Sequence, residues 1–244
     1  MTLLETRGLC RQFDALKAVD EVDFRLREGE IRAIIGPNGA GKSTFVSLLS
    51  GRIPPSAGQV IFAGQDVSRL PAHRRVRLGI AYTFQITNIY PSLTVLENIE
   101  IAAQSRLKPH LFGGAGEAEI RAAATEAAEA VGLGARLASV AGALAYGHQR
   151  LLEVAMGLAL KPRLLILDEP TQGLSDGEIA NFIEVVRRVN REATVLVIEH
   201  NMDVVLALAD RITVLERGRL LAEGTPEEIT ANAAVQAAYL GEPA

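Results

Sequence analysis

A glycine-rich segment between an apolar run and a helix-type sequence constrains the fold of this chain more than any other feature. Its sequence is Gly36-Pro37-Asn38-Gly39-Ala40-Gly41-Lys42-Ser43-Thr44. The preceding residues, 31–35, are mostly apolar and β-branched and predict a buried strand. The following residues, 45–49, predict the first turns of a helix. Because G-x-x-x-x-G-K-[ST] indicates phosphate binding in this strand–loop–helix context, the segment predicts a site for a nucleoside triphosphate.

The residues of this loop have the chemistry that phosphate binding needs. Gly36, Gly39 and Gly41 allow backbone conformations that a Cβ atom would forbid, so successive N–H groups can surround an anion. The N-terminus of the following helix adds its dipole to the same site. We expect Lys42 to place its charge at the β- and γ-phosphates and the Ser43 hydroxyl to bind Mg²⁺. An ordinary glycine-rich turn is the alternative, which the complete motif in its context disfavours.

Composition limits the class of protein and its location. The 244 residues, 48% of them hydrophobic and 22% charged, fit one large globular domain or a domain with a subdomain. The net charge of −4 gives no electrostatic reason to bind nucleic acid. The single cysteine, Cys10, fits a reducing compartment. No apolar run reaches the ~20 residues that span a bilayer, and the N-terminus lacks a signal-peptide pattern. We therefore expect a cytosolic chain that works at a membrane only through a partner.

The apolar pattern changes along the chain in a way that predicts three kinds of structure. Residues 1–30 alternate and predict short antiparallel strands. The runs 163–169 and 194–200 are continuously apolar until their polar ends and predict strands of a parallel sheet covered on both faces. Residues 86–160 are alanine-rich and predict an inserted helical subdomain. Within it, Thr94 and Glu97 form a capping box, and 118–131 predicts a solvent-exposed helix. The basic run 73–77 is interpreted as a solvated helix face rather than a phosphate or partner patch.

Polar residues at the ends of the apolar strands are the candidate catalytic and metal-binding groups. Asp168 is expected to hold Mg²⁺ through water, and Glu169 to orient an attacking water. These acids lie where open α/β sheets bind ligands. Gln85 and His200 also end apolar strands. The Gln85 amide could sense the metal or the water, and the His200 imidazole could donate a hydrogen bond to the γ-phosphate.

Two further features suggest nucleotide contacts outside the loop. The segment 144–150 contains Gly147 just before an apolar helix, which again predicts an anion site made of backbone N–H groups. A second phosphate element has a use if it serves the nucleotide of a partner. Phe13, in the polar stretch 11–14, could stack on a nucleobase, and a buried edge ring is the alternative.

The phosphate loop, Gln85, the segment 144–150, the pair 168–169 and His200, in that order, resemble the nucleotide-binding subunit of an ABC transporter. The resemblance covers essentially the whole chain. It implies an α/β fold: a P-loop NTPase (RecA-like) core with an N-terminal antiparallel β subdomain and an inserted α-helical subdomain at about 86–160, together one domain, 1–244. It also implies an ATPase at the inner face of the plasma membrane. The expected partners are a second copy or a sister ATPase subunit, two permease subunits and, indirectly, a periplasmic substrate-binding protein.

The resemblance also implies roles for individual residues. Two ATP molecules would lie between two subunits, each contacted by the phosphate loop of one and the Gly147 segment of the other. Glu169 would be the catalytic base, Asp168 would support the metal, and Gln85 would contact the metal and couple to the permeases. The remaining nucleotide contacts would be Phe13 on adenine, His200 on the γ-phosphate, residues Gly36, Pro37, Asn38, Gly39, Ala40, Gly41, Lys42, Ser43 and Thr44 of the loop, and Ala145, Tyr146, Gly147 and His148 in trans.

Two positions depart from the family pattern. The family usually has Ser-Gly-Gly-Gln where this chain has residues 145–148, Ala-Tyr-Gly-His, so one hydroxyl donor to the γ-phosphate is missing. The trans contact then depends on the N–H groups at Gly147 and on the helix dipole. The family also has an aspartate where this chain has Ser175. Because Ser175 and Glu178 fit a capping box, Ser175 could instead simply start a helix.

The same departures are similar to one branch, the ATPases of branched-chain amino acid and amide importers. The stretches 83–85, 93–98, 223–229 and 238–241 also match that branch. A urea importer and a lipopolysaccharide-type exporter are alternatives within transporters. A soluble ABC-type ATPase acting on nucleic acid or ribosomes is the alternative of another class, which the acidic charge disfavours. A P-loop kinase would leave Gly147 and His200 unexplained.

Overall fold

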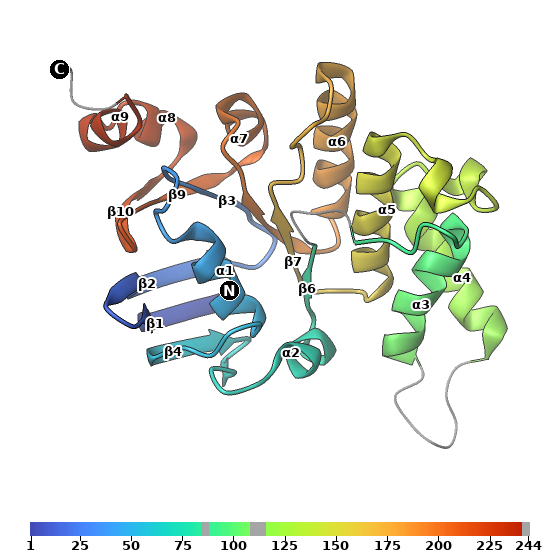
Figure 1. The fold of residues 1–244 in the computed structure, drawn as a ribbon, viewed down its shortest axis with the longest axis horizontal. Helices are drawn as coiled ribbons and strands as arrows, with labels where there is room; N and C mark the ends of the chain where they lie inside the picture. Colours follow the sequence, from blue (N-terminus) through green and yellow to red (C-terminus); the bar gives the residue numbers. More distant parts are fainter. Residues whose placement is uncertain (84–87, 108–115, 241–244) are drawn as a thin grey trace.

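The computed structural model describes residues 1–83, 88–107 and 116–240 and contains two β-sheets flanked by helices (Figure 1). The larger sheet has the strand order β10-β9-β3-β8-β7-β6. Five of its strands are parallel, and β10 pairs antiparallel with β9 at one edge. Their bounds are β3 Ile31–Ile35, β6 Ile80–Tyr82, β7 Leu164–Asp168, β8 Thr194–Ile198, β9 Arg211–Glu216 and β10 Arg219–Gly224. The three apolar runs of the sequence, β3, β7 and β8, are buried at every residue, as a parallel sheet requires.

The smaller sheet is the antiparallel sheet expected at the N-terminus, with the order β2-β1-β4-β5. Its strands are β1 Thr2–Phe13, β2 Leu16–Arg27, β4 Ala57–Phe62 and β5 Gln65–Asp66. The first two are longer than the short strands that the alternating pattern predicts. The sheet packs against α1 (Lys42–Ser50), where the Phe24 and Phe45 rings meet edge to face with centroids 5.5 Å apart. The sheet therefore covers the helix that follows the phosphate loop.

Alternate residues of β7 face two different hydrophobic clusters. Leu164 and Ile166 belong to the cluster that contains the α1 residues and the antiparallel sheet. Leu165 and Leu167 belong to the cluster built on α5 (Tyr146–Ala159) and α6 (Asp176–Val189). Because successive side chains of a strand point to opposite faces, α1 and α5 lie on opposite faces of the large sheet, in agreement with their places in Figure 1.

Helices α3 (Val95–Leu107) and α4 (Glu117–Ala130) pack with α5 beyond this second face (Figure 1). The capping box at the start of α3 is confirmed: Thr94 N–H donates to Glu97 Oε2 at 2.7 Å, and Glu97 N–H donates to Thr94 Oγ1 at 3.2 Å. The expectation that α4 is solvent-exposed is wrong for one of its faces. Small methyl groups let neighbouring helices approach closely, so the spacing of Ile120, Ala123, Ala124, Ala127 and Ala128 creates a buried stripe. Short 3₁₀ turns, η1 (Gly134–Arg136) and η2 (Ala141–Ala143), lead to α5.

The basic run 73–77 lies on α2 (Ala72–Leu78), and its interpretation as a solvated face is wrong at Arg75. Arg74 and Arg77 are exposed, whereas Arg75 is 1% exposed. Its guanidinium donates to the carbonyl oxygens of Leu48 at 2.6 Å and Leu49 at 2.9 Å, at the C-terminal end of α1. Both carbonyls belong to the last turn of α1, where the regular hydrogen bonds of the helix end. The Leu48 carbonyl also accepts from the Gly51 N–H at 3.3 Å, and the buried guanidinium is a donor to both carbonyls. Arg75 therefore fixes the far end of the helix that the phosphate loop begins.

The C-terminal part completes the large sheet and covers its edge. It contains the hairpin of β9 and β10 and the helices α7 (Met202–Leu208), α8 (Pro226–Thr230) and α9 (Ala233–Leu240). Helix α8 begins with a capping box, with Thr225 as N-cap, proline at the first position and Glu228 at the third. No helix in the described part of the chain is both long and apolar enough to cross a membrane.

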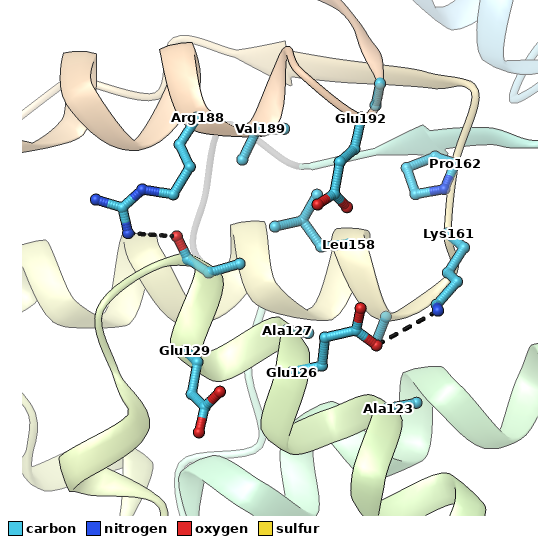
Figure 2. Close-up of a pocket in the computed structure, with 13 residues that line it drawn as sticks. Ala123, Glu126, Ala127, Glu129, Leu158, Lys161, Pro162, Arg188, Val189 and Glu192 are labelled. Atoms are coloured by element: carbon cyan, nitrogen blue, oxygen red, sulfur yellow. Dashed lines mark hydrogen bonds and ion pairs between the residues drawn. The ribbon is translucent and has the colours of Figure 1, made fainter.

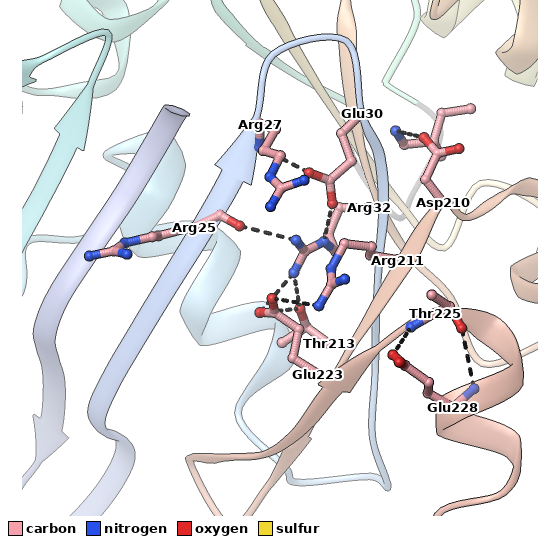
Figure 3. A network of polar contacts seen from close by, with 11 residues as sticks. Arg25, Arg27, Glu30, Arg32, Asp210, Arg211, Thr213, Glu223, Thr225 and Glu228 are labelled. Atoms are coloured by element: carbon pink, nitrogen blue, oxygen red, sulfur yellow. Dashed lines mark hydrogen bonds and ion pairs between the residues drawn. The ribbon is translucent and has the colours of Figure 1, made fainter. Parts of the chain in front are cut away.

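A buried arginine joins this C-terminal part to the two sheets (Figure 3). Arg32 of β3 is 2% exposed and donates from Nε to Glu30 Oε1 at 2.6 Å. Its Nη1 lies 2.8 Å from Glu223 Oε2 of β10, and its Nη2 donates to the Arg25 carbonyl of β2 at 3.1 Å. Thr213 Oγ1 of β9 also accepts from Nη1 at 2.8 Å. One guanidinium thus joins its own strand, β3, to three others: β2, β9 and β10.

Candidate active site

The phosphate loop joins β3 to α1, as the motif predicts, and two of its glycines are required by their surroundings. Gly36 has φ of 153°, and a Cβ on it would lie 2.1 Å from the Leu215 carbonyl oxygen. Gly41, the N-cap of α1, has φ of 97°, and its Cβ would lie 2.2 Å from the Ala18 carbonyl oxygen. Both contacts are with backbone, which cannot move aside cheaply. The glycines therefore allow close approach as well as the left-handed turn.

Lys42 and Ser43 lie in the first turn of α1 and differ in solvent exposure. Ser43 is exposed, whereas Lys42 is buried, and its Nζ donates to the carbonyl oxygens of Gly36 at 2.6 Å and Pro37 at 3.0 Å. Burial lowers the pKa of Lys42, and the carboxylates of Glu169 and Asp168 oppose this effect. The phosphate loop and the end of β7 therefore share one electrostatic site, as the sequence pattern predicts.

Asp168 ends β7 as a buried carboxylate with a specific hydrogen-bond donor. Tyr82 at the end of β6 donates its hydroxyl to Asp168 Oδ2 at 2.5 Å, and Arg52 Nη1 lies 3.0 Å from the Tyr82 hydroxyl. Burial raises the pKa of Asp168, although the bond from Tyr82 acts in the opposite direction. Burial and the Asp168 charge raise the pKa of Tyr82, so the phenol keeps the proton that it donates. The sequence analysis missed Tyr82 and Arg52, although Tyr82 also ends a strand.

Glu169 lies in a conformation that non-glycine residues rarely adopt, with φ of 46°. Its N–H donates to the Ile198 carbonyl of β8 at 2.9 Å, and its side chain is half-buried. A left-handed conformation costs about 1–3 kcal/mol and commonly marks functional positions. The backbone after β7 therefore changes direction at Glu169, the residue predicted to orient the attacking water.

His200 follows β8, and its side chain is exposed. The residue before it, Glu199, has no exposed surface, and the sequence analysis missed it. Glu199 Oε1 accepts from Thr171 N–H at 3.0 Å and Thr171 Oγ1 at 2.6 Å. Its Oε2 accepts from the N–H groups of His200 at 3.1 Å and Asn201 at 3.3 Å. The signal that could have revealed it is a carboxylate at the end of a continuously apolar strand.

The segment with Gly147 does not join the phosphate loop within this chain. It begins α5, across the large sheet from α1, and it lies beside the start of α6. A Cβ on Gly147 would lie 2.4 Å from Glu178 Oε1. Glu178 also accepts from Ser175 N–H at 2.9 Å and Ser175 Oγ at 2.8 Å, which confirms the capping-box interpretation of Ser175.

The other residues of this segment, and Phe13, are placed as follows. Ala145 is the exposed N-cap of α5, Tyr146 is 42% exposed with the Arg150 guanidinium 5.5 Å from its ring centroid, and His148 is half-buried. Phe13, at the end of β1, is 42% exposed and has the Arg11 guanidinium 4.5 Å from its ring centroid. Phe13 is therefore not a buried edge ring. Gln85 lies outside the described residues.

A cavity of about 480 Å³ lies elsewhere, where α4 and the C-terminal ends of α5 and α6 meet (Figure 2). Lys161 Nζ and Glu126 Oε2 are 3.4 Å apart at its edge. Arg188 Nη1 donates across it to the Ala130 carbonyl at 3.1 Å. None of the predicted site residues lines it. The site at the strand ends is therefore separate from this cavity.

The comparisons with known proteins agree with the motif order. The family model "ABC transporter" matches residues 19–172, and the model "Branched-chain amino acid ATP-binding cassette transporter" matches 219–244. The chain is 40% identical to the high-affinity branched-chain amino acid transport ATP-binding protein LivG of Salmonella typhimurium, with 98% of each chain covered.

Solved structures have the same fold over the same length. The ADP conformation of an ATP-binding cassette of an ABC transporter superposes with a TM-score of 0.86 and 28% identity, covering 99% of this chain and 100% of that one. A dimeric ATP-binding cassette bound to ADP and Pi superposes with a TM-score of 0.79 and 25% identity, covering 92% and 99%. By its motifs, fold and relatives, the chain belongs to the ABC transporter ATP-binding proteins, in the branch of the branched-chain amino acid transport ATPases.

Proposed function

We propose that this chain hydrolyses ATP to power the uptake of branched-chain amino acids, or of related amino acids and amides, through separate permease subunits. The observation that carries the proposal is the 40% identity to LivG over essentially the full length, including the C-terminal region 219–244. The juxtaposition of Lys42, Asp168 and Glu169 supplies the hydrolytic site. The proposal treats 1–244 as one ABC domain with its helical subdomain at about 86–160.

The residues of the site fit Mg²⁺ together with a triphosphate. The described residues contain no cluster of three or more His, Cys, Asp or Glu that could hold a metal alone. Magnesium characteristically takes one or two protein oxygens and completes its shell with phosphate oxygens and water. Ser43 and Asp168 supply such oxygens, with Gln85 proposed as a further contact. When bound, Mg²⁺ would neutralise charge on the phosphate oxygens.

We assign each side chain a role that its position supports. The buried Lys42 ammonium, whose charge burial disfavours, would be compensated by the β- and γ-phosphates. Glu169 would accept a hydrogen bond from the attacking water and hold it in line with the γ-phosphorus. His200 would donate to the γ-phosphate. The half-exposed Phe13 ring would stack on adenine.

The second half of the site would come from another subunit, either an identical chain or a sister ATPase. The supporting observation is that the segment 145–148 lies across the sheet from α1, so it cannot reach the loop of its own chain. A solved cassette of this family is dimeric. Ala145 offers no hydroxyl, so the contact to the partner's γ-phosphate would be made by the N–H groups at the start of α5.

We place the permease contact on the described segment after Gln85, at the cytoplasmic face of the membrane. Asn88 N–H donates to the buried Glu153 at 2.7 Å, and Tyr90 N–H donates to Asn98 Oδ1 at 2.7 Å, so this segment is held firmly. The Tyr90 ring is nevertheless 50% exposed. A rigid backbone that presents an exposed aromatic side chain suits a docking surface. A periplasmic substrate-binding protein would act through the permeases.

Replacing Glu169 by glutamine tests the proposal. Glutamine keeps the shape but cannot take up a proton, so ATP turnover should fall by about 10²–10⁴-fold while ATP binding and ATP-dependent dimerisation persist. Glu129→Gln, an exposed carboxylate on α4, is the control and should retain the parental rate. Parental turnover by Glu169→Gln would refute the assignment of the base.

The substrate is tested separately in cells that lack this chain but contain the permeases. Uptake of labelled leucine, isoleucine and valine should return with the parental chain and not with Glu169→Gln. Restoration of urea uptake with no amino acid uptake would favour the urea importer. Restoration of neither, with salt-dependent binding of RNA or DNA, would favour the soluble ABC-type ATPase.

A further inference from the structure

Glu199 is a buried carboxylate whose four hydrogen-bond donors come from two functional segments. It has no exposed surface, and each of its oxygens accepts two hydrogen bonds, at distances between 2.6 and 3.3 Å. Two donors belong to Thr171, two residues after Glu169. The other two belong to His200 and Asn201. One side chain therefore joins the turn that begins at Glu169 to the segment that contains His200.

The backbone around Glu199 extends this connection to the phosphate loop. Glu199 N–H donates to the Ile34 carbonyl at 3.3 Å, two residues before Gly36. Glu169 N–H donates to the Ile198 carbonyl at 2.9 Å, which belongs to the same peptide unit as the Glu199 N–H. The three segments that carry Lys42, Glu169 and His200 thus meet at the peptide unit between Ile198, the last residue of β8, and Glu199.

Stability alone gives little reason for a carboxylate at this position. Burying a charge is expensive, and the four donors to Glu199 are neutral N–H and O–H groups. What a carboxylate provides is two oxygens that both accept hydrogen bonds. A glutamine has one such oxygen, and its amide nitrogen would face either the donors of Thr171 or those of His200 and Asn201.

We propose that Glu199 is a positioning residue for ATP hydrolysis, which fixes the spacing between Glu169 and His200 through its bonds to Thr171 and to the His200 backbone. The inference rests on the proposed function, in which Glu169 orients water and His200 contacts the γ-phosphate. Errors of about 1 Å in such positions cost about 10²-fold in rate. Loss of the carboxylate should therefore lower kcat and leave ATP binding nearly unchanged.

The test uses the full chain with Glu199→Gln and Thr171→Val. We expect Glu199→Gln to lower kcat about 10- to 100-fold, the usual effect of removing a supporting hydrogen-bond partner, with less than a ~3-fold change in KM. Thr171→Val removes one of the four bonds and should lower kcat about 3- to 10-fold. Because both changes act through one contact, the double variant should lose less than the product of the two single losses.

A matched control separates positioning from general stability. Glu30 is another buried carboxylate, 7% exposed, that accepts from Arg32 and from the Arg27 N–H, away from the phosphate loop. Glu30→Gln should lower the melting temperature. Its kcat, calculated from the concentration of folded, ATP-binding chains, should equal that of the parent. If the kcat of Glu199→Gln, counted per ATP-binding site, equals that of the parent or of Glu30→Gln, the inference is refuted.

Two further outcomes are decisive. If Glu199→Gln does not fold, Thr171→Val decides: parental kcat refutes the inference, and a several-fold loss at unchanged KM supports it. Glu169→Gln is measured alongside. Parental turnover in that variant would refute the proposed function itself, whereas its inactivity beside parental kcat in Glu199→Gln would refute only the role of Glu199.

Discussion

Replacing Arg75 by alanine should destabilise the protein strongly, although Arg75 lies in a basic run of sequence. In addition to Leu48 and Leu49, its guanidinium donates to the carbonyl oxygens of Leu70 at 2.9 Å and Ser68 at 3.1 Å. Burial lowers the pKa of Arg75 to about 10, so the group is still charged at neutral pH. Alanine would leave four carbonyl groups without this donor.

The magnitude follows from those four bonds. A hydrogen bond to a charged group contributes about 1.5–3 kcal/mol, so a simple sum gives roughly 6–12 kcal/mol. That sum is too large, because water can reach the freed carbonyls of Ser68 and Leu70 once the side chain is gone. A buried acceptor left without its donor costs about 1–3 kcal/mol, so the two carbonyls at the end of α1 give an expected loss of about 2–6 kcal/mol. For a chain of this length that loss corresponds to a melting temperature lower by about 4–24 °C.

Urea denaturation followed by circular dichroism measures this loss, with Arg74→Ala as the control. Arg74 is exposed on the same helix, so its replacement should change the free energy of unfolding by about 0.5 kcal/mol or less. Arg75→Lys should fall between the two, because an ammonium keeps the charge but lacks the planar fork that reaches several carbonyls at once. A loss below about 1 kcal/mol for Arg75→Ala would refute the reasoning that the end of α1 depends on this side chain.

Two other predictions concern the site. Burial raises the pKa of Asp168, so the fold binds a proton more tightly than the unfolded chain, and the ionised carboxylate destabilises the nucleotide-free protein above that pKa. Asp168→Asn should therefore raise the melting temperature at pH 7.5 by roughly 2–4 °C, or about 1 kcal/mol, and abolish Mg²⁺-dependent ATP binding. The gain in melting temperature should shrink as pH falls toward 4. A gain that does not depend on pH would contradict the burial of the ionised Asp168 carboxylate as its cause. Gly147→Ala places a methyl group 2.4 Å from Glu178 Oε1, and moving that side chain disturbs its capping bonds with Ser175, so scanning calorimetry should detect a loss of about 0.5–2 kcal/mol. ATP-dependent dimerisation, measured by size-exclusion chromatography in a Glu169→Gln background, should weaken at least ~10-fold; dimerisation at the parental ATP concentration would contradict a role for Gly147 in trans.

The sequence was most informative where a constraint is local. The phosphate loop, the strand that ends at Asp168 and the capping box at Thr94 each depend on neighbours within a few residues, and the structure has all of them. Glycines at fixed spacing and continuous apolar runs leave few alternatives.

The remaining features depend on residues that only the tertiary fold brings together. Tyr82 and Asp168 are 86 residues apart in sequence, and Thr171 and Glu199 are 28 apart, so their hydrogen bonds leave no pattern in the sequence. Arg75 is buried only because α2 packs against the end of α1. The buried alanine stripe of α4 has the composition of an exposed helix, and its packing against α3 and α5 decides otherwise.

The contacts of Arg32 link the C-terminal region of this chain to the central sheet, which limits how freely evolution could exchange that region between ATPases. The family model for the C-terminal region begins at residue 219, as if that region were a separate module. Yet Glu223, inside the region, supplies a carboxylate 2.8 Å from a guanidinium buried in the central sheet. An evolutionary exchange of the C-terminal region with a distant ATPase would leave that buried charge short of a partner. The boundary at residue 219 therefore separates Glu223 in sequence from Arg32, although the ion pair between them joins the two regions in the fold.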